Sequence, residues 1–370
     1  MNKVIISGGG TGGHIFPALS IAHALKKLNP ETEILFVGAE GKMEMEKVPA
    51  AGYTIVGLPI AGIKRSISID NLFFPIKLIK SLSKANSILK SFKPDIAIGV
   101  GGYASGPMLF AASMNGIPTL IQEQNSYPGI TNKILSKKAT KICVAYENMN
   151  QFFEASKIMF TGNPVREDIK DLTNKKSLAA NYFNLSDSTP TLLIVGGSQG
   201  ARSINKAIYA GLEKLHEAGI QVIWQTGKSF FVEADEKIKK LNTNKIKAYD
   251  FISKMDLAYA ICDVVVARAG ASTVSELCIV RKPSILVPLP TAAEDHQTKN
   301  CLALVNRHAA LLVKDQDASA TLLNEAIALL NNKPKQLELA NNIAPLARPD
   351  AADTIAKEIF SIINRKKSNA

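Results

Sequence analysis

Short apolar runs alternate with longer helical patterns along the first half of the chain. The runs are rich in Ile and Val and lie at 4–7, 34–37, 96–100, 119–121 and 142–145. Strand-length runs separated by helical segments predict parallel strands joined by crossover helices. In the first helical segment, apolar residues recur at helical spacing from Ile15 to Leu28, and Asn29-Pro30 ends the pattern. The expected fold class is α/β.

The same order of elements starts again in the second half. After the break at Gly162-Asn163-Pro164 and a polar stretch, an apolar run, a glycine loop and a helical pattern follow once more. Further apolar runs lie at 222–225, 264–267, 284–288 and 310–313. We therefore expect two Rossmann-like domains, at 1–163 and 164–349, with parallel sheets facing a central cleft. A length of 370 residues also exceeds what one core usually supports. A last helical pattern, about 350–364, is expected to pack back on the first domain.

Both halves place glycines between a predicted strand and a predicted helix. The first half has Gly8-x-Gly10-x-x-Gly13, and the second has loops at 196–202 and 267–276. Glycines let backbone N–H groups approach an anion, and the positive end of the helix dipole adds to the attraction. The first loop alone is a weak dinucleotide fingerprint, because its candidate acidic partner, Glu40, comes late; a ligand-free turn is the alternative. Three such loops together favour a phosphate-bearing ligand.

Two side chains at these loops are candidates for chemistry. His14 stands where the first loop becomes a helix, and an imidazole titrates near neutral pH, as a general base requires. A structural histidine is the alternative. Thr273-x-x-Glu276 fits a capping box, so Glu276 either caps a helix or accepts hydrogen bonds from ribose hydroxyls.

Several other motifs predict no site. The TGKS sequence at 226–229 lacks the first glycine of a P-loop, since that position is Val222. Asp315-Gln316-Asp317 precedes a helical pattern, so Asp317 is interpreted as a helix cap and not as a metal ligand. The four cysteines are far apart and form no C-x-x-C pair, which argues against a zinc knuckle and fits a reducing compartment. No metal and no cofactor are expected.

The charge of the chain predicts an anionic partner. The net charge is +12 and the pI near 9.4, and the 64–93 segment has seven basic residues against one acidic residue, Asp70. Its apolar residues and lysines fit a membrane-interface helix, although an ordinary core helix with solvated lysines fits as well. The candidate membrane patch is Ile67, Leu72, Phe73, Phe74, Lys77 and Lys80. Nucleic acid is not expected, because the aromatic residues do not alternate with the basic ones.

No signal peptide or membrane span is predicted. The first apolar run, 4–6, is too short for a signal-peptide core. The uncharged segment 96–122 is long enough for a membrane helix, but glycines, Pro107 and Pro118 interrupt it.

Seven motifs occur in order along nearly the whole chain. They are GGGTGGHIFPALSIA, GVGGYASGPMLFAA, QEQNSYPGITNKILSKKA, TGNPVRED, GGSQGAR, ARAGASTVSEL and EDHQTKNC. Together they resemble the MurG family, the N-acetylglucosaminyltransferases of peptidoglycan synthesis.

This resemblance implies a GT-B glycosyltransferase without a cofactor. Its C-terminal domain would hold UDP-GlcNAc, and its N-terminal domain would receive the acceptor at the anionic cytoplasmic face of the cell membrane, as a peripheral protein. The implied reaction transfers GlcNAc, with inversion, to the 4-hydroxyl of MurNAc-pentapeptide-diphosphoundecaprenol (lipid I) and gives lipid II. A cell-wall synthesis complex serving cell shape and division is an implied partner. Another GT-B lipid glycosyltransferase and a UDP-GlcNAc epimerase are the alternatives.

The resemblance also assigns roles to residues of the motifs. His14 would be the base, Tyr103 would place the acceptor, Glu276 would bind the ribose and Gln297 the GlcNAc hydroxyls. The other residues expected to contact UDP-GlcNAc are Thr11, Gly12, Gly13, Asn125, Arg166, Ser198, Ile252, Ala271, Ser272, Thr273, Val274 and Ser275. Several relatives carry histidine where this chain has Gln122, so a proton-transfer role at that position cannot operate here.

Overall fold

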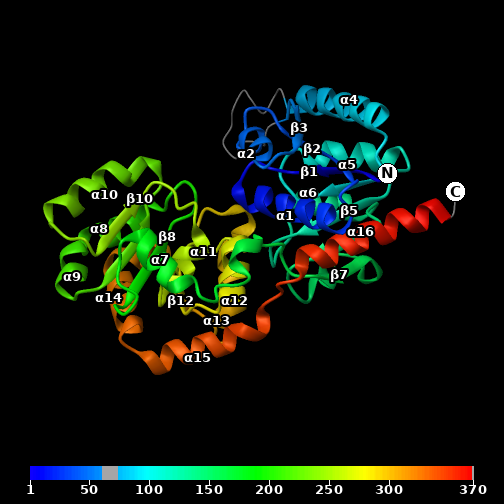
Figure 1. Cartoon of the computed structure of the whole chain (residues 1–370). Helices are drawn as coiled ribbons and strands as arrows, with labels where there is room; N and C mark the ends of the chain where they lie inside the picture. Colours follow the sequence, from blue (N-terminus) through cyan, green and yellow to red (C-terminus); the bar gives the residue numbers. More distant parts are fainter. Residues whose placement is uncertain (61–73, 369–370) are drawn as a thin grey trace. The chain divides into compact units, whose positions relative to one another are not determined.

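The chain forms two compact units, each with its own parallel sheet. A computed structural model describes residues 1–60 and 74–368 (Figure 1). Unit 1 is Met1–Arg166 together with Arg348–Ala370, and unit 2 is Glu167–Ala347. The α/β fold class predicted from the sequence, with two Rossmann-like sheets, is confirmed.

Within its described residues, unit 1 has a seven-stranded parallel sheet of order β3-β2-β1-β4-β5-β6-β7. The strands are β1 (Lys3–Ser7), β2 (Glu33–Ala39), β3 (Thr54–Leu58), β4 (Ile96–Gly99), β5 (Thr119–Glu123), β6 (Lys141–Val144) and β7 (Ile158–Phe160). Strands β4 and β5 are buried at every residue. A strand covered on both faces needs apolar side chains on both, which explains the continuous apolar runs.

Helices cover both faces of this sheet. Helices α1 (Gly12–Leu28), α2 (Glu44–Ala50) and α16 (Ala351–Ser368) share a core with Val4 and Ile6. Helices α4 (Phe74–Phe92), α5 (Ser105–Met114) and α6 (Ile130–Ser136) lie on the opposite face, over Ile5. The alternation follows from the two-residue period of a strand. The C-terminal helix α16 thus completes the core of the unit that contains the N-terminus, and it packs on α1 (Figure 1).

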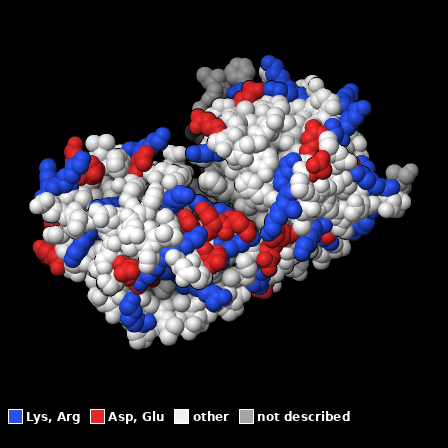
Figure 2. All heavy atoms as spheres, in the orientation of Figure 1, with Lys and Arg blue, Asp and Glu red and all other residues white. Residues whose placement is uncertain are grey.

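Helix α4 carries part of the candidate membrane patch. Lys80 is exposed, and Phe74 and Lys77 are half-buried. Lysine side chains of this helix lie at the top of Figure 2. Ile67, Leu72 and Phe73 lie outside the described residues. In the described part of the chain, no helix combines the length and apolar character that crossing a membrane requires.

Unit 2 is described throughout and has a six-stranded parallel sheet of order β10-β9-β8-β11-β12-β13. The strands are β8 (Thr191–Val195), β9 (Gln221–Gln225), β10 (Ile246–Tyr249), β11 (Val264–Ala267), β12 (Ser284–Leu286) and β13 (Leu311–Leu312). The helices are α7 (Lys175–Phe183), α8 (Arg202–Ala210), α9 (Leu212–Glu217), α10 (Lys228–Lys240), α11 (Met255–Ile261), α12 (Ala271–Val280), α13 (His296–Val305), α14 (Ala318–Leu330) and α15 (Lys333–Ile343). Helices α8, α10 and α14 share the largest part of the core with alternate residues of β8, β9 and β11.

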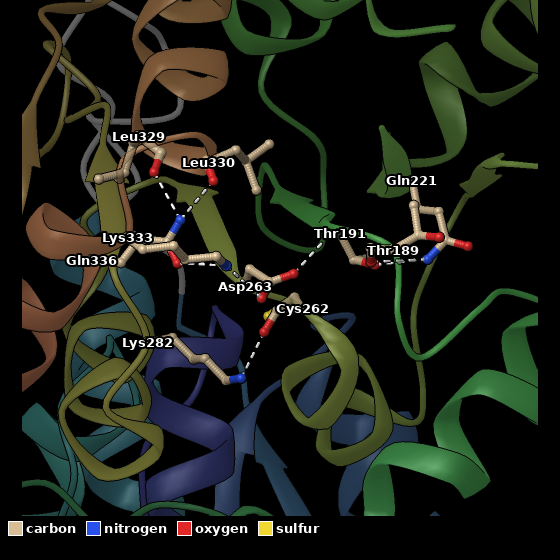
Figure 3. Close-up of polar contacts among 10 residues, drawn as sticks. All are labelled: Thr189, Thr191, Gln221, Cys262, Asp263, Lys282, Leu329, Leu330, Lys333 and Gln336. Atoms are coloured by element: carbon tan, nitrogen blue, oxygen red, sulfur yellow. Dashed lines mark hydrogen bonds and ion pairs between the residues drawn. The ribbon is translucent and has the colours of Figure 1, made fainter. Parts of the chain in front are cut away.

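Side chains tie the strands of unit 2 together at their amino ends (Figure 3). Asp263 accepts a hydrogen bond from the Thr191 backbone at 2.9 Å and pairs with Lys333 at 3.3 Å. The amide of Gln221 donates to Thr191 Oγ1 at 2.9 Å and to Thr189 O at 3.4 Å. These hydrogen bonds satisfy buried polar groups at the amino ends of the strands. They therefore stabilise unit 2 at the end of the sheet away from the glycine loops.

Candidate functional site

The glycine loops lie at the topological switch point of each sheet. In unit 1 the chain runs outward from β1 to β2 and β3 and then crosses to β4 on the other side of β1. In unit 2 it runs from β8 to β9 and β10 and then crosses to β11 on the other side of β8. In open parallel sheets, loops at such a point diverge at the carboxyl ends of the strands and leave a crevice where ligands bind. Each unit therefore has a candidate binding edge of its own.

The first glycine loop donates a hydrogen bond to a carboxylate of α2 that the sequence did not indicate. Glu44 on α2 is 1% exposed, and its Oε2 accepts a hydrogen bond from the Gly10 backbone at 2.8 Å. Its Oε1 accepts one from Ala39 at 3.0 Å. Glu40, the acidic candidate named from the motif, instead pairs with Lys84 at 2.8 Å on the surface. One backbone N–H group of this loop, that of Gly10, is thus already hydrogen-bonded to the Glu44 side chain.

His14 lies in the first turn of α1, with Thr11 at the N-cap position and Gly12 and Gly13 before it. Its Nδ1 is 3.0 Å from Gly9 O and 3.3 Å from Thr11 Oγ1. A carbonyl oxygen only accepts, so in the neutral ring the proton sits on Nδ1, and Nε2 is the basic nitrogen. This tautomer is the one a base acting through Nε2 requires.

The loop after β4 meets the His14 ring. A Cβ placed on Gly101 would lie 2.9 Å from His14 Nε2, and the residue has φ +86°, which a side chain disfavours. The Gly101 carbonyl also accepts a hydrogen bond from the Gly9 backbone at 3.3 Å. Tyr103 follows in the same loop, is 50% exposed, and has its ring beside Gly10. The structure therefore brings His14 and Tyr103 to the same end of the sheet, beside the first glycine loop.

Gln122 is fully buried, and its side chain forms hydrogen bonds with Asn163 and Gln124. Its amide donates to Asn163 Oδ1 at 2.9 Å, and Asn163 donates to Gln124 O at 2.9 Å. Gln124 in turn donates to Val100 O at 2.7 Å and to the Gln122 side chain. The Gln122 side chain thus connects β5 with the loops around it.

Asn125 is fixed by a buried carboxylate, Glu123. Glu123 Oε1 accepts from the Asn125 backbone at 2.9 Å, and Oε2 accepts from Asn132 Nδ2 at 2.8 Å. Burial raises the pKa of the Glu123 carboxyl above its ordinary value, and the hydrogen bonds from Asn125 and Asn132 oppose that rise. Arg166 is half-buried and is the last residue of the first segment of unit 1.

In unit 2, one glutamine joins two loops. Gln225, at the end of β9, donates to Gly197 O at 2.9 Å, and its Oε1 accepts from the Ile252 backbone at 2.8 Å. Ser198 is exposed next to Gly197, whereas the side chain of Ile252 is 3% exposed. No sequence motif indicated Gln225, because its hydrogen-bond partners come from distant loops.

Arg268 organises the loops around β11. Its guanidinium donates to Val287 O at 3.0 Å and to Ser203 Oγ at 3.0 Å, and it pairs with Asp315. The Asp315-Gln316-Asp317 motif thus supplies an ion-pair partner, and Asp317 is at the N-cap position of α14 without a side-chain capping bond. Among the described residues, no group of three or more His, Cys, Asp or Glu side chains is placed to hold a metal.

The capping-box interpretation of Thr273 and Glu276 is wrong. The N-cap residue of α12 is Gly270, so the helix begins before Thr273, and Glu276 lies beyond its first turn. Glu276 Oε2 instead accepts a hydrogen bond from the Tyr259 hydroxyl at 2.9 Å. Ala271 and Val274 are buried, whereas Ser272, Thr273, Ser275 and Glu276 are half-buried. Capping therefore does not account for this carboxylate.

Gln297 lies at the start of α13 and is oriented by the backbone. Its Oε1 accepts from the Leu289 N–H at 3.0 Å, which orients the amide group. Glu294 and Asp295, which precede α13, are non-glycine residues with φ of +53° and +52°. Neighbouring His296 has Nδ1 2.6 Å from Ala293 O, and burial lowers its pKa below the ordinary value.

Comparisons with known proteins agree along the chain. Residues 4–144 match the Glycosyltransferase family 28 N-terminal domain, and 191–355 match the Glycosyltransferase family 28 C-terminal domain. A Cytophaga hutchinsonii protein named UDP-N-acetylglucosamine–N-acetylmuramyl-(pentapeptide) pyrophosphoryl-undecaprenol N-acetylglucosamine transferase is 56% identical over 362 residues, which cover 98% of this chain and 97% of the relative. A Parabacteroides distasonis protein of the same name is 52% identical over 364 residues, 98% of this chain and 99% of the relative. The crystal structure of Acinetobacter baumannii MurG is similar with a TM-score of 0.77 at 29% identity, covering 98% of this chain and 100% of that one.

Proposed function

Because the chain belongs to the MurG family of N-acetylglucosaminyltransferases, we propose that unit 2 binds the donor and that unit 1 binds the acceptor and carries the base. The reaction is the transfer of GlcNAc from UDP-GlcNAc to the 4-hydroxyl of the MurNAc of lipid I, which gives lipid II with inversion. A single displacement needs a group that takes the acceptor proton and groups that stabilise the departing UDP.

The different surroundings of the two glycine loops are the observation that carries this division. In the unit 1 loop, the Gly10 N–H already donates a hydrogen bond to the buried side chain of Glu44, so this N–H group is not available to a donor diphosphate. No acidic side chain of the described residues bonds the 196–201 loop of unit 2. That loop and the N-terminus of α12 are therefore the better site for a diphosphate.

We assign the donor contacts of unit 2 accordingly. Ser198 contacts the diphosphate, Ile252 the uracil and Gln297 the GlcNAc hydroxyls. The 271–276 segment contacts the phosphate and nucleoside, with Glu276 on the ribose. When the bond between C1 and the UDP oxygen breaks, the N–H groups of the 196–201 loop and of the first turn of α12 stabilise the charge that develops on UDP. From unit 1, Thr11, Gly12, Gly13, Asn125 and Arg166 approach the donor.

His14 is the proposed base. As the acceptor oxygen attacks C1 of GlcNAc, its proton passes to His14 Nε2, while Nδ1 keeps its proton in the hydrogen bond to Gly9 O. The carbonyl accepts more strongly from the cationic ring that forms, so this bond favours the proton transfer. Tyr103, exposed beside Gly10, is proposed to place the acceptor.

The outer surface of α4, α5 and α6 is the proposed membrane contact at the cytoplasmic face. Large apolar side chains are exposed there: Ile76, Ile79, Phe110, Met114, Ile130 and Ile134. Lys80, Lys137 and Lys138 lie exposed on or beside the same helices. Exposed apolar groups bordered by lysines are typical of proteins that lie on an anionic bilayer, where each lysine contributes about 1 kcal/mol.

Transfer of radiolabelled GlcNAc from UDP-GlcNAc to a lipid I analogue tests the assignment. Wild type is expected to form product, and His14→Ala and Glu276→Ala are expected to lose at least about 100-fold in kcat/KM, as removal of a base or a binding carboxylate does. His216→Ala, at an exposed position on α9, is the matched control and should retain wild-type turnover. Full turnover of His14→Ala would remove His14 as the base.

A further inference from the structure

A hydrogen bond joins Tyr259 and Glu276 where α11 and α12 meet in unit 2. Tyr259 is 1% exposed, and its hydroxyl donates to Glu276 Oε2 at 2.9 Å. A buried phenol needs a partner for its hydroxyl group, and an ionised carboxylate only accepts. The bond therefore has one polarity, from the tyrosine to the glutamate, and it holds the carboxylate group at one of its two oxygens.

The tyrosine is the rigid member of this pair. Its ring is enclosed in the core, and α11, which carries it, packs along α7. Glu276 is half-buried on α12. An exposed glutamate samples several rotamers and a broad range of its last torsion angle. The fixed hydroxyl of Tyr259 selects one orientation of the carboxylate plane before any ligand arrives.

We propose that Tyr259 is a positioning residue that orients Glu276 toward both ribose hydroxyls and so sets selectivity for ribonucleotide over 2′-deoxyribonucleotide donors. The proposal rests on the ribose contact of Glu276 given above. A carboxylate has about four acceptor positions, and Tyr259 occupies one. The 2′- and 3′-hydroxyls are neighbouring donors, so one carboxylate binds both only when its plane is held at the right angle.

Preorganisation of the Glu276 carboxylate lowers the free-energy cost of binding the donor. Without the Tyr259 hydroxyl, Glu276 still accepts hydrogen bonds. Its side chain then becomes ordered only when the donor binds, and the entropy cost of that ordering reduces the affinity for the donor. A carboxylate whose plane is held less tightly also adapts more readily to a single hydroxyl. Loss of the tyrosine hydroxyl is therefore expected to weaken binding of the ribose donor more than that of a 2′-deoxyribose donor.

The test compares two donors on matched variants. kcat and KM are measured for UDP-GlcNAc and for the 2′-deoxyuridine analogue with wild type, Tyr259→Phe, Glu276→Asp and Glu276→Ala. Wild type should prefer the ribose donor by at least about tenfold in kcat/KM, the effect of one hydrogen bond to a charged group. Tyr259→Phe should reduce that preference by about threefold or more through KM for UDP-GlcNAc, with kcat within about twofold of wild type.

Glu276→Asp withdraws the carboxylate from Tyr259 without altering the tyrosine, and it should reduce the preference in the same direction. Tyr209→Phe, on α8, loses a hydroxyl elsewhere in unit 2 and should leave the preference unchanged. Equal losses for both donors in Tyr259→Phe, or an unchanged preference, would overturn the role of Tyr259. A wild-type preference retained by Glu276→Ala would instead overturn the ribose contact itself.

Discussion

At the scale of single residues, the site depends on close contacts between loops that are far apart in the sequence. Gly101 is the clearest case, because its Cα faces the His14 ring from another loop. Gly101→Ala adds a methyl group 2.9 Å from His14 Nε2 and should displace the imidazole. We expect kcat to fall by about 100-fold, since misplacement of a catalytic group by about 1 Å has effects of that size. The KM for UDP-GlcNAc should remain within about twofold of wild type.

The control for that variant is Gly52→Ala. Gly52 has φ +84°, close to the +86° of Gly101, so both variants strain the backbone alike, but no atom lies within 4 Å of the added methyl group at Gly52. Steady-state kinetics and thermal unfolding of both variants separate the displaced ring from lost stability. If both variants turn over equally, His14 does not take part in the chemistry.

His296 predicts how the stability of the folded chain depends on pH. Burial lowers the pKa of its imidazole in the folded chain, so the unfolded chain binds a proton first as the pH falls. The stability contribution is present above the unfolded pKa near 6.5 and is lost as the pH falls through the lower folded value. Urea unfolding at pH 7.5 and 5.5 should show a larger loss for wild type than for His296→Asn. Equal losses in the two proteins would contradict the predicted effect of burial.

Sequence motifs identified candidate site residues only where the residues that mark the site lie close together in the sequence. His14 and Glu276 stood out because glycines or a serine-threonine run surround them. Glu44, Gln225 and Tyr259 did not, because each acts through a partner that folding brings close. The error in the capping box had the same origin: spacing alone could not reveal that α12 begins at Gly270 and not at Thr273.

At the scale of elements, the sequence predicted the central strands and one edge strand, β13, and missed the other three edge strands. The missed strands are β3 and β7 in unit 1 and β10 in unit 2, and each lies at an edge. An edge strand has one neighbour and is more exposed, so its apolar run is shorter or interrupted. Thr54 and Phe160 are exposed, for instance, whereas β4 and β5 are buried throughout. Helix α1 ends at Leu28 with Asn29 as its C-cap, as the sequence predicted.

Strand β9 offers a test within one element. Gln225→Leu leaves Gly197 O and the Ile252 N–H without their buried partner, which costs about 1–3 kcal/mol for each group. Because these loops are the proposed diphosphate and uracil contacts, we expect KM for UDP-GlcNAc to rise by about tenfold or more. UDP binding measured by calorimetry should weaken in parallel.

Gln221→Leu is the control at the opposite end of the same strand. Gln221 is also 3% exposed and makes several hydrogen bonds, but at the amino edge of the sheet (Figure 3). Its loss should lower the free energy of unfolding to a similar extent and leave KM within about twofold of wild type. If both variants changed KM equally, the effect would come from stability and not from the position of the two loops.

At the scale of the whole molecule, the excess of basic residues predicts binding to anionic membranes. Lys80→Glu with Lys137→Glu reverses two charges on the proposed membrane surface, and co-sedimentation with phosphatidylglycerol vesicles should weaken by at least about tenfold. Lys206→Glu with Lys240→Glu makes the same change of net charge on exposed positions of unit 2 and should bind as wild type does. Equal weakening in the two double variants would mean that net charge, and not this surface, attracts the protein to the bilayer.

The return of α16 to unit 1 has a consequence for biosynthesis. Ile355, Ile359 and Ile363 fill the core beside α1, yet they are translated only after residues 167–347. At about 5–20 residues per second, that interval lasts on the order of ten seconds or more. During it, the nascent strands of unit 1 present an uncovered apolar surface, a candidate for chaperone binding. Unit 2 emerges as one uninterrupted stretch, so the half of the protein that is translated second is the half that completes its fold first.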